Sequence, residues 1–342
     1  MFNSINTDVD VNDDDEFFIA LCQSGFHSYI VAGVQRKGQF RLLLSVGKYS
    51  FSTSLTLIKE VLFSHSKAFL SNEYLAHGRY NIEANQYDTP REVQASYSAY
   101  AINYIQYLKL IDLIEKASPF IRCYRPVEQT GSLIKLEWRQ GNNQGVNPSV
   151  IDNINNLTIR NTCRTTALDI VDYIAHPLLS AKVSRKFYKP LPLKTIFQNG
   201  YAQHLYILPQ PLDAKKTQNI SPLIREVFID IYKRLDDLLC STHRSISTRE
   251  KFEAIKNVYN ELITCDKNDL PAFKRKMEHL IISNQGIIFQ HRNYSLILKK
   301  LGHKTASENL FIKINKRIEK QIQNTLGTST SQSSSEIKHS LT

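Results

Sequence analysis

The chain has 342 residues, of which 42% are hydrophobic and 10% aromatic, so it can bury a substantial core, and its length favours two domains. Its 12 glycines and 11 prolines are few for this length, which favours long helices and compact strands over a turn-rich all-β fold. The sequence holds no apolar run of eighteen residues and no basic, hydrophobic signal peptide, which excludes a membrane-spanning or Sec-exported chain.

The charges and cysteines indicate which partners and which redox compartment suit the chain. The net charge is +11, although residues 8–16 contain six acidic residues, and a basic body of this kind attracts acidic partners or simply exposes a solvated face. Five scattered cysteines without a C-x-x-C pair argue against a disulfide framework or structural zinc. We therefore expect reduced thiols in a cytoplasmic protein, with no cofactor and no metal.

The N-terminal part shows the patterns of an α+β domain. After an acidic leader at residues 1–15, which we expect to be disordered, three β-rich runs predict an antiparallel meander at residues 17–22, 26–34 and 40–49. Helical spacing follows at residues 54–70 and 97–117, strand patterns at 120–124 and 132–138, and a Gly, Asn and Pro-rich loop at 140–148. A helix at residues 162–179 and a strand at 204–208 complete the predicted α+β domain, residues 16–212.

The C-terminal part shows only helical spacing. Four apolar stripes of this kind, and a further candidate at residues 291–301, predict a helical bundle over residues 220–326, with Asp269 as the N-cap of one helix and Pro271 in its first turn. Residues 327–342 are rich in Ser and Thr, which predicts a flexible tail.

Cys163 is the most interpretable candidate for chemistry. If Asn161 caps the helix, Cys163 lies in its first turn, where free N–H groups and the helix dipole stabilise a thiolate, and Arg164 adds positive charge. A cysteine beside the apolar stripe of a helix is otherwise a buried structural residue.

A histidine that could serve as general base to this thiol lies upstream. His27 follows Gly25 and Phe26 near the start of the second predicted strand, on the face of Tyr29 and Val31. The alternative role for a strand histidine is a satisfied core residue.

The order of these motifs, a strand histidine followed later by a cysteine at a helix start, resembles the circularly permuted papain-like cysteine hydrolases, which include the lecithin-retinol-acyltransferase-like proteins. The resemblance covers about residues 17–210 and implies an acyl-enzyme formed on Cys163 with His27 as base. It also implies a third polar residue on the next strand, where Arg41 to Tyr49 offers Ser45 or Lys48, and we name Ser45 as the candidate.

The composition suggests a biological setting for such an enzyme. The acidic leader, the Asn, Lys and Ile-rich body and the Ser/Thr-rich tail are similar to type IV secreted effectors of intracellular bacteria. The resemblance implies translocation into a host cell without a cleaved signal peptide, a protein substrate or partner, and no nucleic acid.

Two readings stay open. The first is a cysteine hydrolase or acyl-transfer enzyme with a helical module that selects a partner. The second is a non-enzymatic interaction protein whose bundle and basic surface bind a macromolecule. The basic aromatic run Arg185-Lys186-Phe187-Tyr188-Lys189 either contacts a polyanion or covers the edge of the sheet.

Overall fold

The structure is a computed structural model that describes residues 8–50, 66–73, 80–81, 86–87, 92–118, 120–141, 153–158, 160–175, 183–212, 220–240, 246–291 and 303–336. Statements of absence below refer to these residues. The chain divides into two compact units, Met1–Gln210 and Pro211–Thr342. Within the described residues, no helix combines the length and the apolar character that crossing a membrane requires.

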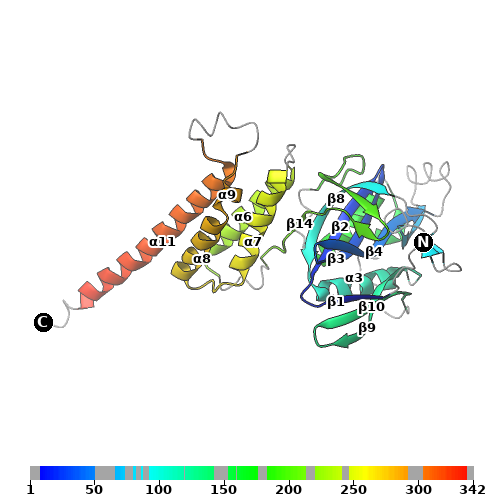
Figure 1. Cartoon of the computed structure of the whole chain (residues 1–342), viewed down its shortest axis with the longest axis horizontal. Helices are drawn as coiled ribbons and strands as arrows, with labels where there is room; N and C mark the ends of the chain where they lie inside the picture. Colours follow the sequence, from blue (N-terminus) through cyan, green and yellow to red (C-terminus); the bar gives the residue numbers. More distant parts are fainter. Residues whose placement is uncertain are drawn as a thin grey trace. The chain divides into compact units, whose positions relative to one another are not determined.

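The first unit is α+β with mainly antiparallel strands, as predicted, and Figure 1 shows its sheets and helices in blue to green. Its strands are β1 (Asp8–Asn12), β2 (Glu16–Ser24), β3 (His27–Arg36), β4 (Gln39–Ser50), β5 (Ser66–Asn72), β6 (Tyr80–Asn81), β7 (Gln86–Tyr87), β8 (Val93–Ile102), β9 (Arg122–Thr130), β10 (Leu133–Gln140), β11 (Asn156–Leu157), β12 (Leu193–Gln198), β13 (Tyr201–Ala202) and β14 (Ile207–Leu208). Its helices are α3 (Tyr104–Ala117) and α5 (Cys163–Ile174).

Six strands close into a barrel in the order β2, β3, β4, β13, β12 and β8, with β8 pairing back to β2. The predicted meander corresponds to β2, β3 and β4. The β3–β4 turn is a two-residue loop in which Lys37 and Gly38 both have positive φ, the geometry that matches the twist of a hairpin. At Gly33, where the β3–β4 register shifts, a Cβ would clash with the carbonyl oxygen of Arg41, so only glycine fits.

Helix α5 covers the outer face of β3, β4 and β2, and α3 packs against α5. Strand β2 is buried from Phe17 to Gln23 because one of its faces points into the barrel and the other lies under the helices. The apolar stripe of α5 includes Leu168, Val171 and Ile174, as its spacing predicts. This packing fixes the first turn of α5, and with it Cys163, against the start of β3.

A separate three-stranded sheet has the order β1, β10, β9. The prediction of a disordered leader is wrong for residues 8–12, because β1 pairs with β10. Alternation explains the difference: Val11 is fully buried, whereas Asp8 on the other face forms an ion pair with Lys135 at 2.9 Å.

Three predicted helices differ from the structure. Residues 97–102 belong to strand β8, and the helix begins only at Tyr104 after an Asn103 capping box. Residues 66–70 form part of strand β5, and the rest of the helix predicted at 54–70 lies outside the described residues. Helix α5 ends at Ile174, and residues 176–182 also lie outside the described part.

The second unit contains α6 (Pro222–Cys240), α7 (Ile246–Ile263), α8 (Leu270–Ser283), α9 (Gln285–Ile288) and α11 (Ala306–Glu336). Their apolar faces form one core, in which Phe228, Tyr259 and Phe273 pack edge to face. Asp269 caps α8 with Pro271 in the first turn, as predicted. Helix α11 continues to Glu336, which corrects the prediction of a flexible segment beginning at residue 327, and most of the helix predicted at 291–301 lies outside the described residues.

Candidate active site

The hairpin between β2 and β3 presents the histidine. Ser24 pairs with His27 across the turn, Gly25 takes a positive φ, and Phe26 at the tip is 73% exposed. His27 is therefore the first residue of β3, at the end of the barrel where α5 begins. Its ring lies beside the rings of Tyr29 and Tyr49, with centroids 5.8 and 5.0 Å away.

Cys163 is the first residue of α5, directly after the N-cap. The cap is Thr162 and not Asn161: the Thr162 hydroxyl accepts from the Thr165 N–H, and the Thr165 hydroxyl accepts from the Thr162 N–H. The Ser28 N–H points at the Cys163 sulfur from 3.4 Å, and the Phe26 carbonyl oxygen lies 3.9 Å from it. The fold thus joins the two residues that the sequence analysis singled out, although they lie more than a hundred positions apart.

The His27 ring bridges the thiol and a carboxylate. Its Nε2 lies 2.8 Å from Glu73 Oε2, which leaves Nδ1 as the ring atom available to Cys163. Glu73 is 2% exposed, and the same oxygen accepts a hydrogen bond of 2.5 Å from the Tyr49 hydroxyl. Glu73 directly follows β5, where its N–H donates to the Ser45 carbonyl oxygen at 2.9 Å.

The position against His27 that the sequence analysis gave to Ser45 is occupied by Glu73. The Ser45 hydroxyl is buried and has no hydrogen-bond partner within the described residues, so only its backbone contacts Glu73. The sequence does not indicate Glu73, because it follows the helix predicted at residues 54–70 and lies in a polar stretch without a clear pattern. Burial alternates at Ser66, Ala68 and Leu70 in the structure, but the apolar Phe69 between them hides this alternation in the sequence.

Gly47 makes room for the contact between His27 and Glu73. It pairs with Tyr29 in the sheet, and a Cβ on it would lie 2.6 Å from His27 Nε2 and 3.1 Å from Glu73 Oε2. Any larger residue would push the imidazole and the carboxylate apart. Glycine at this position is therefore part of the site.

The electrostatics of the site favour charge separation between the thiol and the imidazole. Burial lowers the pKa of His27, but its interactions with Cys163 and Glu73 outweigh burial and raise the pKa to about 9. Burial raises the pKa of Cys163, but the hydrogen bond with His27, the Ser28 N–H, the His27 charge and the Arg164 N–H together lower it below its ordinary value. These directions favour a thiolate and imidazolium pair at neutral pH.

The other two cysteines of the first unit, Cys22 and Cys123, have raised thiol pKa values. Burial raises the pKa of Cys22, and it raises the pKa of Cys123 to about 12. In the second unit, Cys240 is exposed and Cys265 is half-buried. Among the three cysteines of the first unit, Cys163 is therefore the one whose surroundings lower the thiol pKa.

Three exposed aromatic side chains lie on the two segments that contact the start of α5, through the Phe26 and Lys189 carbonyl oxygens. The rings of Phe26 and Phe187 meet edge to face at 6.2 Å, and Tyr188 adjoins Phe187 at 5.8 Å. All three rings are exposed, and the Gln23 amide holds the segments together by donating to the Gly25 and Phe187 carbonyl oxygens at 2.8 and 2.7 Å. We call Phe26, Phe187 and Tyr188 the aromatic rim.

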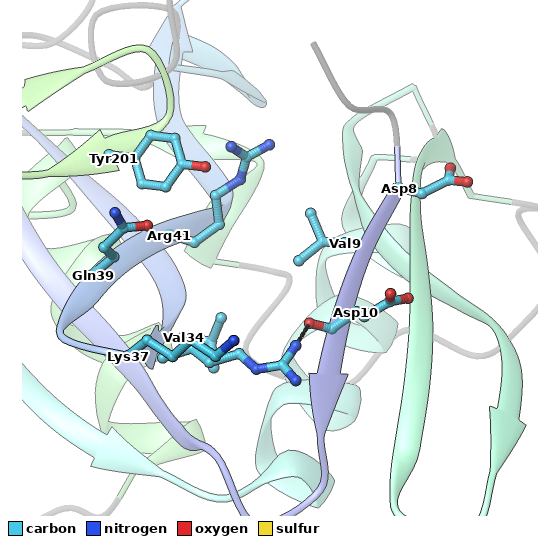
Figure 2. A pocket seen from close by; sticks show the side chains of 9 residues that line it. Asp8, Val9, Asp10, Val34, Lys37, Gln39, Arg41 and Tyr201 are labelled. Atoms are coloured by element: carbon cyan, nitrogen blue, oxygen red, sulfur yellow. Dashed lines mark hydrogen bonds between the residues drawn. The ribbon is translucent and has the colours of Figure 1, made fainter.

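A cavity of about 370 Å³ lies elsewhere in the first unit, between β1 and the β3–β4 hairpin. Figure 2 shows Arg41 and Tyr201 on one side of this cavity and Asp8, Val9 and Asp10 of β1 on the other. The Arg41 guanidinium stacks on Tyr201, and its Nη2 donates to the Tyr124 hydroxyl at 2.7 Å, so this nitrogen serves an internal contact. No group of three or more His, Cys, Asp or Glu side chains that could hold a metal ion occurs in the described part of the chain.

Comparisons with known proteins add no relative: no family model matches the chain, and neither a curated protein nor a solved structure is detectably similar to it.

Proposed function

We propose that the chain is a cysteine-dependent hydrolase or acyl-transfer enzyme, with Cys163 as nucleophile, His27 as acid and base, and Glu73 as the residue that orients His27. The observation that carries this proposal is the His27 imidazole, which lies 2.8 Å from a buried carboxylate and interacts with the Cys163 thiol so that the thiol pKa falls and the imidazole pKa rises. A helix start and a charged histidine beside one partly exposed thiol are the conditions that nucleophilic cysteine chemistry requires.

In the proposed reaction, the Cys163 thiolate attacks the carbonyl carbon of an amide, ester or thioester, and the carbonyl electron pair moves onto the oxygen. When the tetrahedral adduct collapses, the bond to the leaving group breaks, and that group takes the proton from the His27 imidazolium. The acyl group is then bound to sulfur. Neutral His27 next takes a proton from water or another acceptor, which attacks the acyl carbon and releases Cys163 as thiolate.

Glu73 has a supporting role in this scheme. Its bond to Nε2 keeps Nδ1 directed at the sulfur and stabilises the imidazolium that accompanies the thiolate. Tyr49 holds the carboxylate in place and satisfies part of its hydrogen-bonding capacity. The geometry is compatible with a protease, a deamidase, an acyltransferase or a thioesterase, since these differ in the acyl group and the acceptor.

The decisive experiment measures alkylation of Cys163 by iodoacetamide as a function of pH. The full chain carries Cys240→Ser and Cys265→Ser, so that Cys163 is the accessible thiol. We expect rapid labelling at pH 6, well below the ordinary cysteine pKa of about 8.5, and a loss of at least about tenfold in His27→Ala at that pH.

The matched control is His279→Ala, which removes an exposed histidine of α8 in the second unit. This variant should label like the parent. Slow labelling of the parent at pH 6, or a His27→Ala profile that coincides with it, would rule out the proposed nucleophile.

A further inference from the structure

Two buried cations lie beside Cys163 in addition to His27. Lys48 of β4 is 4% exposed and Arg164, the next residue after the cysteine, is 0% exposed. Buried lysine and arginine side chains are rare unless a negative charge or a full set of hydrogen bonds compensates them. Their hydrogen-bond partners therefore show whether a negative charge compensates each buried positive charge.

All partners of Lys48 are neutral. Its Nζ donates to the carbonyl oxygens of Asn153 and Asn156 at 2.7 and 2.6 Å, to Asn161 Oδ1 at 3.1 Å and to Thr166 Oγ1 at 2.9 Å. No described carboxylate lies within ion-pair distance of it, and Asp169 on α5 instead pairs with Arg185 at 2.5 Å.

The partners of Arg164 are neutral as well. Its Nε donates to Ser28 Oγ at 3.0 Å, and its Nη2 donates to the Lys189 carbonyl oxygen at 2.8 Å and to Gln23 Oε1. Its Nη1 is buried without a partner among the described residues. The guanidinium thus ties the nucleophile helix to both segments of the aromatic rim, but no carboxylate neutralises it.

Both cations contact the residues around Cys163: Lys48 bonds Asn161 and Thr166 on either side of it, and Arg164 bonds Ser28, whose N–H points at the sulfur. Burial lowers the pKa of Lys48 to about 8, and the negative charges that act against burial are those of Cys163 and then Asp169. Burial also lowers the pKa of Arg164, and Cys163 is the charge that opposes it. A thiolate at Cys163 gives two otherwise uncompensated buried cations a counter-ion, whereas a neutral thiol leaves them without one.

We propose that Lys48 and Arg164 are positioning residues that hold Cys163 as a thiolate independently of His27. This inference rests on the proposed function, because it explains how the nucleophile stays charged. Lys48 also fixes the helix start, since the Asn161 side chain that accepts from it donates in turn to the carbonyl oxygens of Asn153 and Asn156 at 2.6 and 2.7 Å. The network thus orients the first turn of α5 and places a positive charge near the sulfur.

The test is the apparent pKa of the Cys163 thiol, taken from the pH dependence of iodoacetamide alkylation in the full chain with Cys240→Ser and Cys265→Ser. Lys48→Met should raise this pKa by about one unit or more, since it removes a nearby buried charge. Lys48→Arg should restore most of the shift. Thr166→Val, which removes one neutral partner of Lys48 and leaves its charge, is the matched control and should keep the pKa within a few tenths of a unit.

A folded Lys48→Met protein with the parental thiol pKa would overturn the inference. If that variant does not fold, the reciprocal measurement applies. Cys163→Ser should lower the pKa of Lys48, which NMR of ¹³C-methylated lysine measures, and an unchanged pKa would equally overturn the inference.

The same measurements distinguish failure of this inference from failure of the proposed function. If Lys48→Met raises the thiol pKa and His27→Ala has no effect, the pairing of Cys163 with His27 is wrong and the role of the cations stands. If His27→Ala slows labelling and Lys48→Met has no effect, only the role of the cations is wrong.

Discussion

The imidazole of His27 illustrates how much one side chain depends on its neighbours. Its pKa of about 9 results from a thiol on one ring nitrogen and a buried carboxylate on the other, acting against burial. Because this pKa lies above the ordinary value of 6.5, the interaction stabilises the fold fully below pH 6.5, and the stabilisation is lost as the pH rises through about 9.

Glu73→Gln should therefore lower the pKa of His27 by about one unit or more, because a neutral amide cannot stabilise the imidazolium as a carboxylate does. NMR titration of the imidazole C–H signals measures this shift, with His27→Ala identifying the resonance. Glu137→Gln, on the exposed face of β10, is the control. An unaltered His27 titration in Glu73→Gln would mean that the carboxylate does not act on the ring.

Residue types predicted part of this site. His27 and Cys163 could be singled out because each has a local signal, a glycine turn before a strand and a polar cap before an apolar stripe. Glu73 has no such signal, because its place beside His27 arises from strand pairing between β4 and β5. Lys48 was the alternative to Ser45 as the third polar residue, but its contacts with the start of α5 arise from the packing of α5 across the barrel. The identification of Glu73 and of the contacts of Lys48 required the three-dimensional structure.

At the scale of elements, the aromatic rim is unusual because it exposes three rings that the structure holds in place. The rings of Phe187 and Tyr188 are exposed, and contact with a polyanion or cover of a sheet edge by this basic aromatic run stays a prediction. Anchoring by Gln23 and Arg164 fixes the backbone under these rings. A fixed apolar surface beside a nucleophile can bind the apolar part of a substrate at low entropic cost.

Replacing Phe26 and Phe187 by serine should therefore slow the reaction of Cys163 with a hydrophobic electrophile, N-benzyl iodoacetamide, by about threefold to tenfold relative to iodoacetamide. The ratio of the two labelling rates is the measurement, because it cancels any change in the thiol itself. Ile246→Ser, at an exposed apolar residue of α7, is the control. An equal ratio in parent and variant would contradict a role for the rim in substrate binding.

Element boundaries show where periodicity misleads. Residues 97–117 contain apolar side chains at spacings compatible with one long helix, yet β8 occupies the first part because its backbone pairs with β2 and β12. The side chain of Asn103 then starts the helix. Long-range pairing overrides local preference here, and no local pattern reveals it.

For the molecule as a whole, the contacts given above for Cys163, His27 and Glu73 are made within the first unit. A chain of residues 1–212 should therefore fold and retain the labelling profile of Cys163 between pH 6 and 9. Circular dichroism and the iodoacetamide assay measure this, and loss of the low-pH reactivity in a folded fragment would show that the helical unit contributes to the site. The fragment with His27→Ala gives the reference for an unactivated thiol.

The missing side chain at position 47 also affects how other proteins with the proposed site could be found. A glycine within a buried strand weakens the strand, so its presence there needs a specific reason, which here is the room for the His27 and Glu73 side chains. A search pattern can require a glycine at the position of Gly47 and an acidic residue at the position of Glu73. Such a pattern selects for the room that the imidazole and the carboxylate need as well as for the reactive residues. Such a pattern could identify distant members of this enzyme type in sequences where the remaining residues have diverged.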